Sequence, residues 1–105
     1  MEETELNLTK LIDLINIWSF ERGLHNADSS KQLLKLQEEV GELTQAHLKG
    51  HLNKKHDSVG DIMVVLTIYC QQEDISLRRC VQDAYDVIKD RKGRMVDGVF
   101  IKEGD

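Results

Sequence analysis

Two segments of this chain share one pattern: an acidic residue, a variable residue, Val-Gly, a second acidic residue and an aliphatic residue. The segments span residues 38–43 and 57–62 and therefore lie nineteen positions apart. The repeat predicts two helices that each contribute half of one carboxylate site. At the variable position Glu39 is matched by Ser58. The other matched pairs are Glu38 and Asp57, Val40 and Val59, Gly41 and Gly60, Glu42 and Asp61, and Leu43 and Ile62.

The spacing of apolar residues predicts an all-α chain. Proline, the usual helix breaker, is absent. Helices are expected over residues 6–22, 31–49, 53–72 and 77–92, with stops at Gly23 and Gly50 and a cap from Ser29 or Ser30. Residues 62–70 are apolar almost all round, as in a helix buried by its own bundle or by a second subunit. The predicted inner faces are Leu8, Leu11, Ile12, Ile15 and Trp18 on the first helix, and Leu33, Leu36, Val40 and Leu43 on the second.

The tail, residues 94–105, has a different pattern. Asp97-Gly98 is a preferred two-residue turn and separates two short apolar runs, which predicts a small hairpin. The expected fold is one domain over residues 1–105, a four-helix bundle-like structure with a short C-terminal tail. Because the third helix is too apolar for one subunit to cover, a homo-oligomer is expected, either a dimer or a tetramer.

Composition excludes several functional classes. The 14 basic and 19 acidic residues give a net charge of −5, which argues against nucleic acid as a partner. Cys70 and Cys80 have no CxxC spacing and are expected to be reduced, buried thiols. No signal-peptide pattern is visible, and the apolar run over residues 62–70 is too short to span a bilayer. A cytoplasmic location without a membrane partner is the expectation.

The acidic residues of the repeat are placed to meet. Residues three or four apart share a helix face, so Glu42 pairs with Glu38 and with Glu39, and Asp57 pairs with Asp61. The stripe through Asp61 continues into apolar residues and is expected to face the core. A buried, unpaired carboxylate costs several kcal/mol unless a cation or a proton compensates it. A site of oxygen ligands favours Mg²⁺, with Mn²⁺ as a substitute. The alternative interpretation is a set of solvated charges on amphipathic helices.

Gly41 and Gly60 directly precede candidate ligands of this site. A glycine inside a helix costs about 1 kcal/mol relative to alanine. Two glycines at matched positions therefore suggest a packing reason, and they are predicted to let the two helices approach closely.

Glu38-Glu39-x-x-Glu42, followed after a spacer by Asp61, resembles the MazG-like group of all-α nucleoside triphosphate pyrophosphohydrolases. The motif of that group is EExxE followed by ExxD. The resemblance covers most of the chain, and its specific part is confined to residues 38–61. It implies Mg²⁺-dependent hydrolysis of a nucleoside triphosphate, deoxy or non-standard, to a monophosphate and pyrophosphate. Ser58 stands where the second motif begins with Glu. Either Asp57 replaces that ligand, or the site holds one ion fewer.

The resemblance also implies roles for single residues. Glu39, Glu42 and Asp61 would hold the metal, and Glu38 at the rim would orient a water molecule or accept its proton. Lys89 and Arg91, with the neighbouring Lys92 and Arg94, would contact substrate phosphates; otherwise they are cations favourably placed at a helix C-terminus. Trp18 would stack on the nucleobase, or it belongs to the core or an interface.

Other functions stay open on the sequence alone. His47, His51 and His56 could form a zinc site, although Gly50 interrupts their helix. The substrate could be another nucleotide-like diphosphate, such as a phosphoribosyl-nucleotide. The chain could also be a catalytically weak or silent regulator that binds nucleotide and metal, which the departure at Ser58 suggests. Finally, it could be a helical interaction module, which predicts no dependence on metal.

Overall fold

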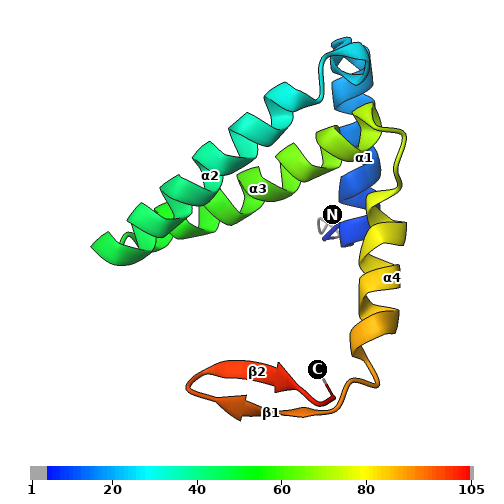
Figure 1. Cartoon of the computed structure of the whole chain (residues 1–105). Helices are drawn as coiled ribbons and strands as arrows, with labels where there is room; N and C mark the ends of the chain where they lie inside the picture. The colour runs from blue at the N-terminus through cyan, green and yellow to red at the C-terminus, as the bar shows by residue number, and fades with distance from the viewer. Residues whose placement is uncertain (1–4, 105) are drawn as a thin grey trace.

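The computed structural model of the protein describes residues 5–104, so residue 105 of the predicted tail lies outside the described residues. The predicted fold class is confirmed: four helices precede a small C-terminal hairpin (Figure 1). In chain order the elements are α1 (Leu8–Glu21), the short 3₁₀-helix η1 (Leu24–Asn26), α2 (Ser30–Lys49), α3 (Leu52–Gln72), α4 (Leu77–Ile88), β1 (Gly93–Val96) and β2 (Val99–Lys102).

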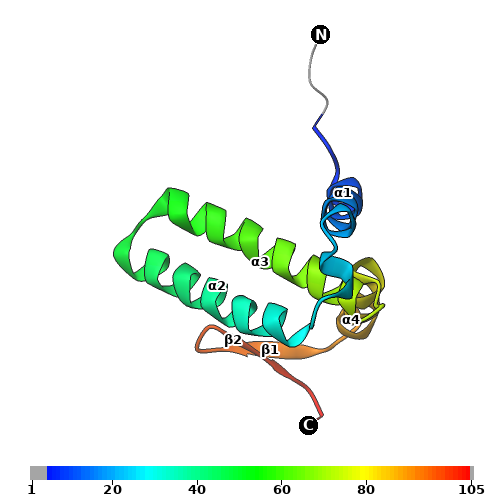
Figure 2. The ribbon, with the colours of Figure 1, turned by 90° about the horizontal axis from the view of Figure 1, so that it is seen from above.

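Helix α3 is the centre of the fold. It lies antiparallel beside α2 along its length, and α1 crosses its C-terminal part (Figures 1 and 2). Its apolar residues form most of the core, namely Val65, Ile68 and Cys70, with Ala46 contributed by α2. The burial expected for the apolar third helix is therefore confirmed, because α1, α2 and η1 all pack against it.

Side-chain hydrogen bonds fix the C-terminal end of α3. Gln71 Nε2 donates to the carbonyl oxygen of Asn16 on α1 at 2.8 Å, and Gln72 Nε2 donates to that of Leu24 on η1 at 2.9 Å. Ser29 Oγ, just before α2, donates to Glu73 Oε2 at 2.9 Å. Three separate segments are thus tied to one end of one helix.

The helix ends follow the expected cap chemistry with one exception. Ser76 Oγ accepts from the Arg79 amide at 3.1 Å, and Gly50 closes α2 in the left-handed region at φ 71°. Ser29 is the N-cap residue of α2, as predicted, but its side chain makes no capping hydrogen bond to the helix. Asp28 Oδ1 accepts from the Ser30 amide at 3.0 Å instead, because the Ser29 hydroxyl is bonded to Glu73.

Two of the predicted inner faces are rotated. On α1 the side toward α3 contains buried Ser19, with Ile12 and Ile15 half-buried, whereas Leu8 and Trp18 are exposed. On α2 the buried positions are Glu39 and Ala46, and Val40 is 46% exposed. The reason is geometric: apolar residues occupy two adjacent stripes of each helix, and contact with α3 covers only one of them.

The predicted elements of the C-terminal region, a helix followed by a hairpin, are confirmed, but the predicted end of the helix is wrong. Helix α4 ends at Ile88, not at residue 92, so Arg91 and Lys92 follow the helix and lie in the turn that leads to β1. The hairpin is confirmed: Asp97 and Gly98, at φ 49° and 80°, form its turn. Cys80 on α4 is exposed, contrary to the prediction, because this helix has little cover from the rest of the chain.

A single chain is open in shape. Its radius of gyration is 16.8 Å, where a compact chain of this length has about 13 Å. Its accessible surface is 8598 Å², where a compact monomer of 12.1 kDa exposes about 6,000 Å². Figure 1 shows the cause: α4 leads away from the α2–α3 pair, and the hairpin at its far end turns back below the pair. Within residues 5–104, no helix is both long and apolar enough to cross a membrane.

Gly41 and Gly60 do not serve close helix approach, so this prediction is wrong. Among the described residues, nothing lies within 4 Å of a Cβ atom built at either position. Gly41→Ala and Gly60→Ala should therefore each raise the free energy of unfolding by about 0.5–1 kcal/mol in chemical denaturation. Gly50→Ala, also unobstructed but at positive φ, should lower it by about 1 kcal/mol. Destabilisation by both helix substitutions would instead show that something covers these glycines in solution.

Candidate functional site: a buried carboxylate between two helices

Glu39 is the buried acid of the repeat. Its residue is 9% exposed, on the face of α2 that packs against α3. Oxygen Oε2 is enclosed and, within the described chain, has no hydrogen-bond partner. A buried carboxylate oxygen without a donor is costly, so this position calls for a proton or a cation.

The surroundings of Glu39 raise its pKa above the usual value of 4.5. Burial is the largest cause, because it disfavours the charged form. The negative charges of Glu42 and Asp61, and a hydrogen bond with Glu42, raise the pKa further, while the positive charge of Lys35 opposes these effects. Carboxylates of α2 and α3 therefore interact electrostatically across the helix pair.

Ser58 occupies the matching position on α3. It is 2% exposed, one helical turn before Asp61, on the face of α3 that the other helices cover. Glu39 and Ser58 are thus the two buried members of the repeat, one an acid and the other a hydroxyl. The site consequently encloses one carboxylate. An acid at residue 58 in place of the serine would give it a second.

The other predicted ligands are placed differently from the expectation. Asp61 is exposed and does not face the core, because Ser58 and Val65 occupy the buried stripe of α3. Glu42 is also exposed, one turn after Glu39. Asp57 is exposed and lines a hollow at the start of α3 with Leu52 and Asn53, and it is not among the charges that shift the pKa of Glu39.

The unpartnered Glu39 oxygen and the neighbouring negative charges of Glu42 and Asp61 suit a hard divalent cation. Among residues 5–104, no three His, Cys, Asp or Glu side chains stand together as a ready-made ligand shell. Within this part of the chain, neither the carboxylates of the repeat nor the histidines considered for zinc form such a cluster.

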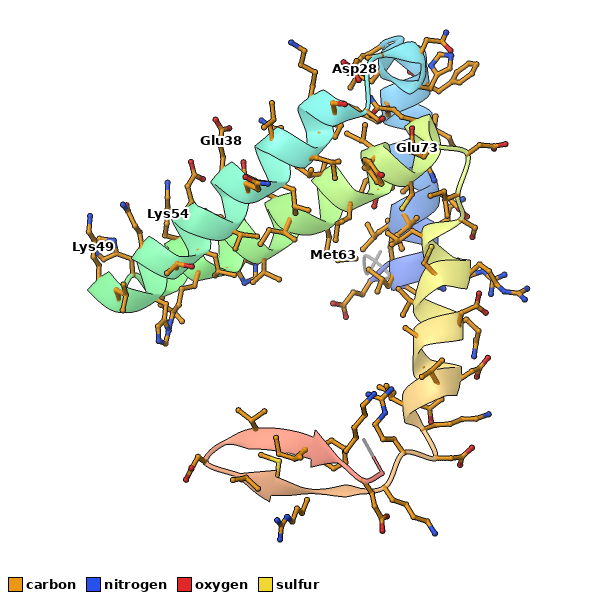
Figure 3. All side chains as sticks on the ribbon, viewed as in Figure 1. Asp28, Glu38, Lys49, Lys54, Met63 and Glu73 are labelled. Carbon is orange, nitrogen blue, oxygen red and sulfur yellow. The ribbon has the colours of Figure 1, made fainter. Side chains whose placement is uncertain are left out.

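The remaining predicted site residues are not gathered around Glu39 within one chain. Glu38 is exposed and lies on the edge of the α2–α3 pair away from the hairpin (Figure 3). Lys89 follows α4, and its Nζ lies 3.6 Å from Asp86 Oδ1; Arg91 lies in the next turn. Trp18 is 46% exposed on α1, with the Arg22 guanidinium 4.3 Å from the centre of its ring.

The sequence reasoning assigned no role to the lysines near the carboxylates. Lys35 lies one turn before Glu39, and its positive charge acts on that carboxylate. A second group lines a cavity of about 240 Å³ beside Glu42, where α2 turns into α3, and includes Lys49, His51 and Lys54. Figure 3 shows Lys49 and Lys54 at this end of the helix pair. Their side chains could contact an anionic group next to the carboxylates.

The raised pKa of Glu39 predicts a pH-dependent stability. Between the unfolded value near 4.5 and the higher folded value, the folded chain binds more protons, so the free energy of unfolding falls as pH rises through this window. Glu39→Gln should remove this fall. The measurement is urea denaturation in EDTA at a series of pH values, with Glu38→Gln, which alters the exposed neighbour, as the control. Identical profiles for wild type and Glu39→Gln would contradict the assignment.

Comparison with known proteins gives a family match that covers all four helices. Residues 8–91 match the family described as phosphoribosyl-ATP pyrophosphohydrolase. An uncharacterized 18.2 kDa protein from the rep–hol intergenic region of Haemophilus phage HP1 is 37% identical over 70 residues. This alignment covers 66% of the chain and 43% of the phage protein, so the chain spans less than half of that relative's length. No solved structure matches the chain.

The family match confirms the resemblance at the level of the superfamily but not for the MazG group itself. A match over residues 8–91 includes both halves of the carboxylate repeat and leaves out the hairpin. The family description implies a pyrophosphohydrolase, a hydrolase that acts on acid anhydrides. The chain belongs to the phosphoribosyl-ATP pyrophosphohydrolase family, within the MazG-like all-α nucleoside triphosphate pyrophosphatases.

Proposed function

We propose that the protein hydrolyses a nucleoside triphosphate between its α and β phosphates, in a Mg²⁺-dependent reaction that releases pyrophosphate. The observation that carries this proposal is the enclosed Glu39 carboxylate, whose Oε2 has no partner in the described chain and which lies in the field of Glu42 and Asp61. The family match supports the reaction class. Mn²⁺ is the expected substitute for Mg²⁺.

Glu39, Glu42 and Asp61 are the residues that would hold the cation. When bound, a divalent ion supplies neutralisation of phosphate charge and Lewis-acid activation of water. Glu39 gives a fixed point, since the helix contact restricts its side chain, and exposed Glu42 and Asp61 can adjust around the substrate. Glu38 is proposed to accept the proton of the attacking water. Asp57 stays the alternative ligand, although its exposed position at the start of α3 supports it less.

An acidic chain needs cations to bind a triphosphate. Lys49 and Lys54 line the cavity beside Glu42 and are proposed to contact the phosphate tail. Lys89 and Arg91 are proposed to do the same, although nothing in one chain holds them at the site. Trp18 is proposed to contact the nucleobase through the ring face that Arg22 leaves uncovered.

The family description makes phosphoribosyl-ATP a second candidate substrate. It would present the same kind of phosphate chain to the same carboxylates, so the metal site does not separate the two candidates. A panel of standard, deoxy and non-standard triphosphates together with phosphoribosyl-ATP, scored for pyrophosphate release, distinguishes them. Release of single phosphate from every substrate would refute the proposed reaction.

A homo-oligomer is part of the proposal. The chain exposes about 2,600 Å² more surface than a compact monomer of its mass. Large apolar side chains are exposed on three helices, including Leu34 at 64%, Val59 at 52% and Val87 at 64% exposure. Burying such side chains against a second copy would stabilise an oligomer.

Glu42→Gln and Asp61→Asn should each lower Mg²⁺-dependent pyrophosphate release roughly 100-fold or more, because each removes a charge that the cation and phosphates require. Both residues are exposed, so helical circular dichroism should be unchanged. Asp13→Asn, on α1, is the matched control and should retain activity. Full activity in both site variants would remove these carboxylates from the mechanism.

Ser58→Glu tests whether the buried position of α3 faces the cation. In EDTA the added acid should lower the free energy of unfolding by about 1–3 kcal/mol, because it is enclosed. Saturating Mg²⁺ should restore more stability to this variant than to wild type. His56→Glu places the same group on an exposed polar residue of α3 and is the control. A loss that Mg²⁺ does not reduce would place Ser58 away from the metal.

A further inference from the structure

The two cysteines lie on either side of the corner between α3 and α4. Cys70 stands in the last turn of α3 and is 7% exposed, whereas Cys80 stands in the first turn of α4 and is exposed. Between them the Ile75 amide donates to the Cys70 carbonyl oxygen at 2.8 Å, and Asp74 takes a positive φ of 57°. This tight turn brings the start of α4 back to the end of α3.

The side chains of the two cysteines are in contact. Burial raises the pKa of the Cys70 thiol, and Cys80 raises it further through its charge and through a hydrogen bond between the two side chains. A disulfide requires Cβ atoms that are about 4 Å apart. Thiols that share a hydrogen bond lie close to this arrangement, so the two sulfur atoms can be joined without a rearrangement of either helix.

The two thiols differ in their access to solvent. Cys80 is exposed on α4, and a small molecule can reach it directly. Cys70 is buried, but it lines a cavity of about 540 Å³ between α1, the end of α3 and the start of α4, together with Thr67 and Leu77. The cavity leaves the Cys70 side chain room to turn. Cys80 is therefore the thiol that an oxidant meets first, and Cys70 is the thiol that reacts second.

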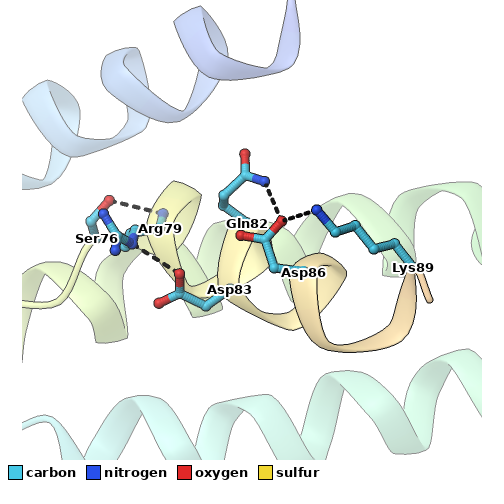
Figure 4. Close-up of polar contacts among 6 residues, drawn as sticks. All are labelled: Ser76, Arg79, Gln82, Asp83, Asp86 and Lys89. Carbon is cyan, nitrogen blue, oxygen red and sulfur yellow. Dashed lines mark hydrogen bonds and ion pairs between the residues drawn. The ribbon is translucent and has the colours of Figure 1, made fainter. Parts of the chain in front are cut away.

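Helix α4 has many internal contacts but is weakly attached to α3. Its polar side chains bond to one another (Figure 4): Arg79 Nε donates to Asp83 Oδ1 at 2.9 Å, and Gln82 Nε2 donates to Asp86 Oδ1 at 3.1 Å. These contacts stay within α4, and the helix packs against α3 only slightly. A covalent bond in its first turn would therefore fix the whole helix relative to α3.

We propose that Cys70 and Cys80 form a site of reversible oxidation, where a disulfide fixes the start of α4 to the end of α3. The oxidant class is a small disulfide such as glutathione disulfide. The Cys80 thiolate attacks one sulfur of the oxidant, whose S–S bond breaks and releases a first small thiol. Cys70 then attacks the Cys80 sulfur of the mixed disulfide and releases a second small thiol. Two electrons and two protons thus pass from the cysteines to the oxidant.

Proximity favours closure within one chain. Because Cys70 already contacts Cys80, the second step is intramolecular and does not depend on protein concentration. A bond between the Cys80 residues of two copies would need two chains to meet with these side chains facing each other. The bond within one chain is therefore the expected product. None of the carboxylates of the repeat takes part, so the proposal does not depend on nucleotide hydrolysis.

Peptide mapping tests the bond directly. Reduced full-length protein is incubated with glutathione disulfide, alkylated, denatured and digested with trypsin, which cleaves between the cysteines at Arg78 and Arg79. The expected product joins the peptides of residues 56–78 and 80–89, in a protein that migrates as one chain on non-reducing denaturing electrophoresis. Dithiothreitol should separate the two peptides. Unreacted thiols, a stable glutathione adduct at Cys80 without closure, or chains joined to one another would overturn the proposal.

Two variants test the order of the steps. Cys70→Ala should keep a stable glutathione adduct at Cys80, because the second thiol is missing. Cys80→Ser leaves the buried Cys70 alone and should take up glutathione roughly 10-fold more slowly or less. Since Cys80 is exposed, its replacement should leave the helical circular dichroism unchanged. Equally fast modification of the two variants would overturn the assigned order.

Thermal unfolding tests whether the bond fixes α4. Oxidised wild type should have a Tm about 5 °C higher than reduced wild type, because the closed loop restricts the unfolded chain. Cys80→Ser, treated in the same way, is the control and should show no rise. An unchanged Tm in fully oxidised wild type would show that the bond leaves α4 as loosely attached as before, which overturns the proposed role of the disulfide.

Discussion

The contact between α2 and α3 is the interaction on which the rest of the structure depends. It encloses Glu39 and Ser58, brings Asp61 within electrostatic reach of Glu39, and provides the apolar wall against which α1 and η1 are tied. Hydrophobic burial along α3 has to offset the enclosure of a carboxylate in the same contact. A small core, made largely of α3 residues, thus carries a charged group that a plain structural bundle would have no reason to keep.

The tension between stability and chemistry is concentrated at a single residue. Glu39 is disfavoured in its charged form by burial and by two neighbouring acids, and Lys35 relieves this only in part. The same features that make Glu39 a poor core residue support the proposal that it holds a divalent ion. Ser58 limits the enclosed charge to one carboxylate, where a second acid would add to the repulsion. This balance accounts for one buried acid surrounded by exposed ones.

Sequence reasoning located the elements because their signals are local. Gly50 and the Asp97-Gly98 turn stand where the chain takes positive φ, and apolar spacing marked all four helices. It could not choose between adjacent helix stripes, and for that reason it assigned the core-facing acid to Asp61 instead of Glu39. Nor could it foresee that the Ser29 hydroxyl bonds to Glu73, 44 residues away, since only the folded chain brings them together. Contacts between residues far apart in the sequence determine which stripe of each helix faces the core, and the spacing of apolar residues does not reveal this.

The site and its support come from one continuous stretch of chain, residues 30–72. A helical hairpin of this kind forms from contacts that are near in sequence, which favours early and rapid formation during folding. Elements attached at its two ends can diverge in length or sequence without disturbing the acids. The helical hairpin of α2 and α3 therefore carries the carboxylates within one stretch of chain. Joined to other flanking segments, it would keep its charge pattern while the size and specificity of the surrounding assembly changed.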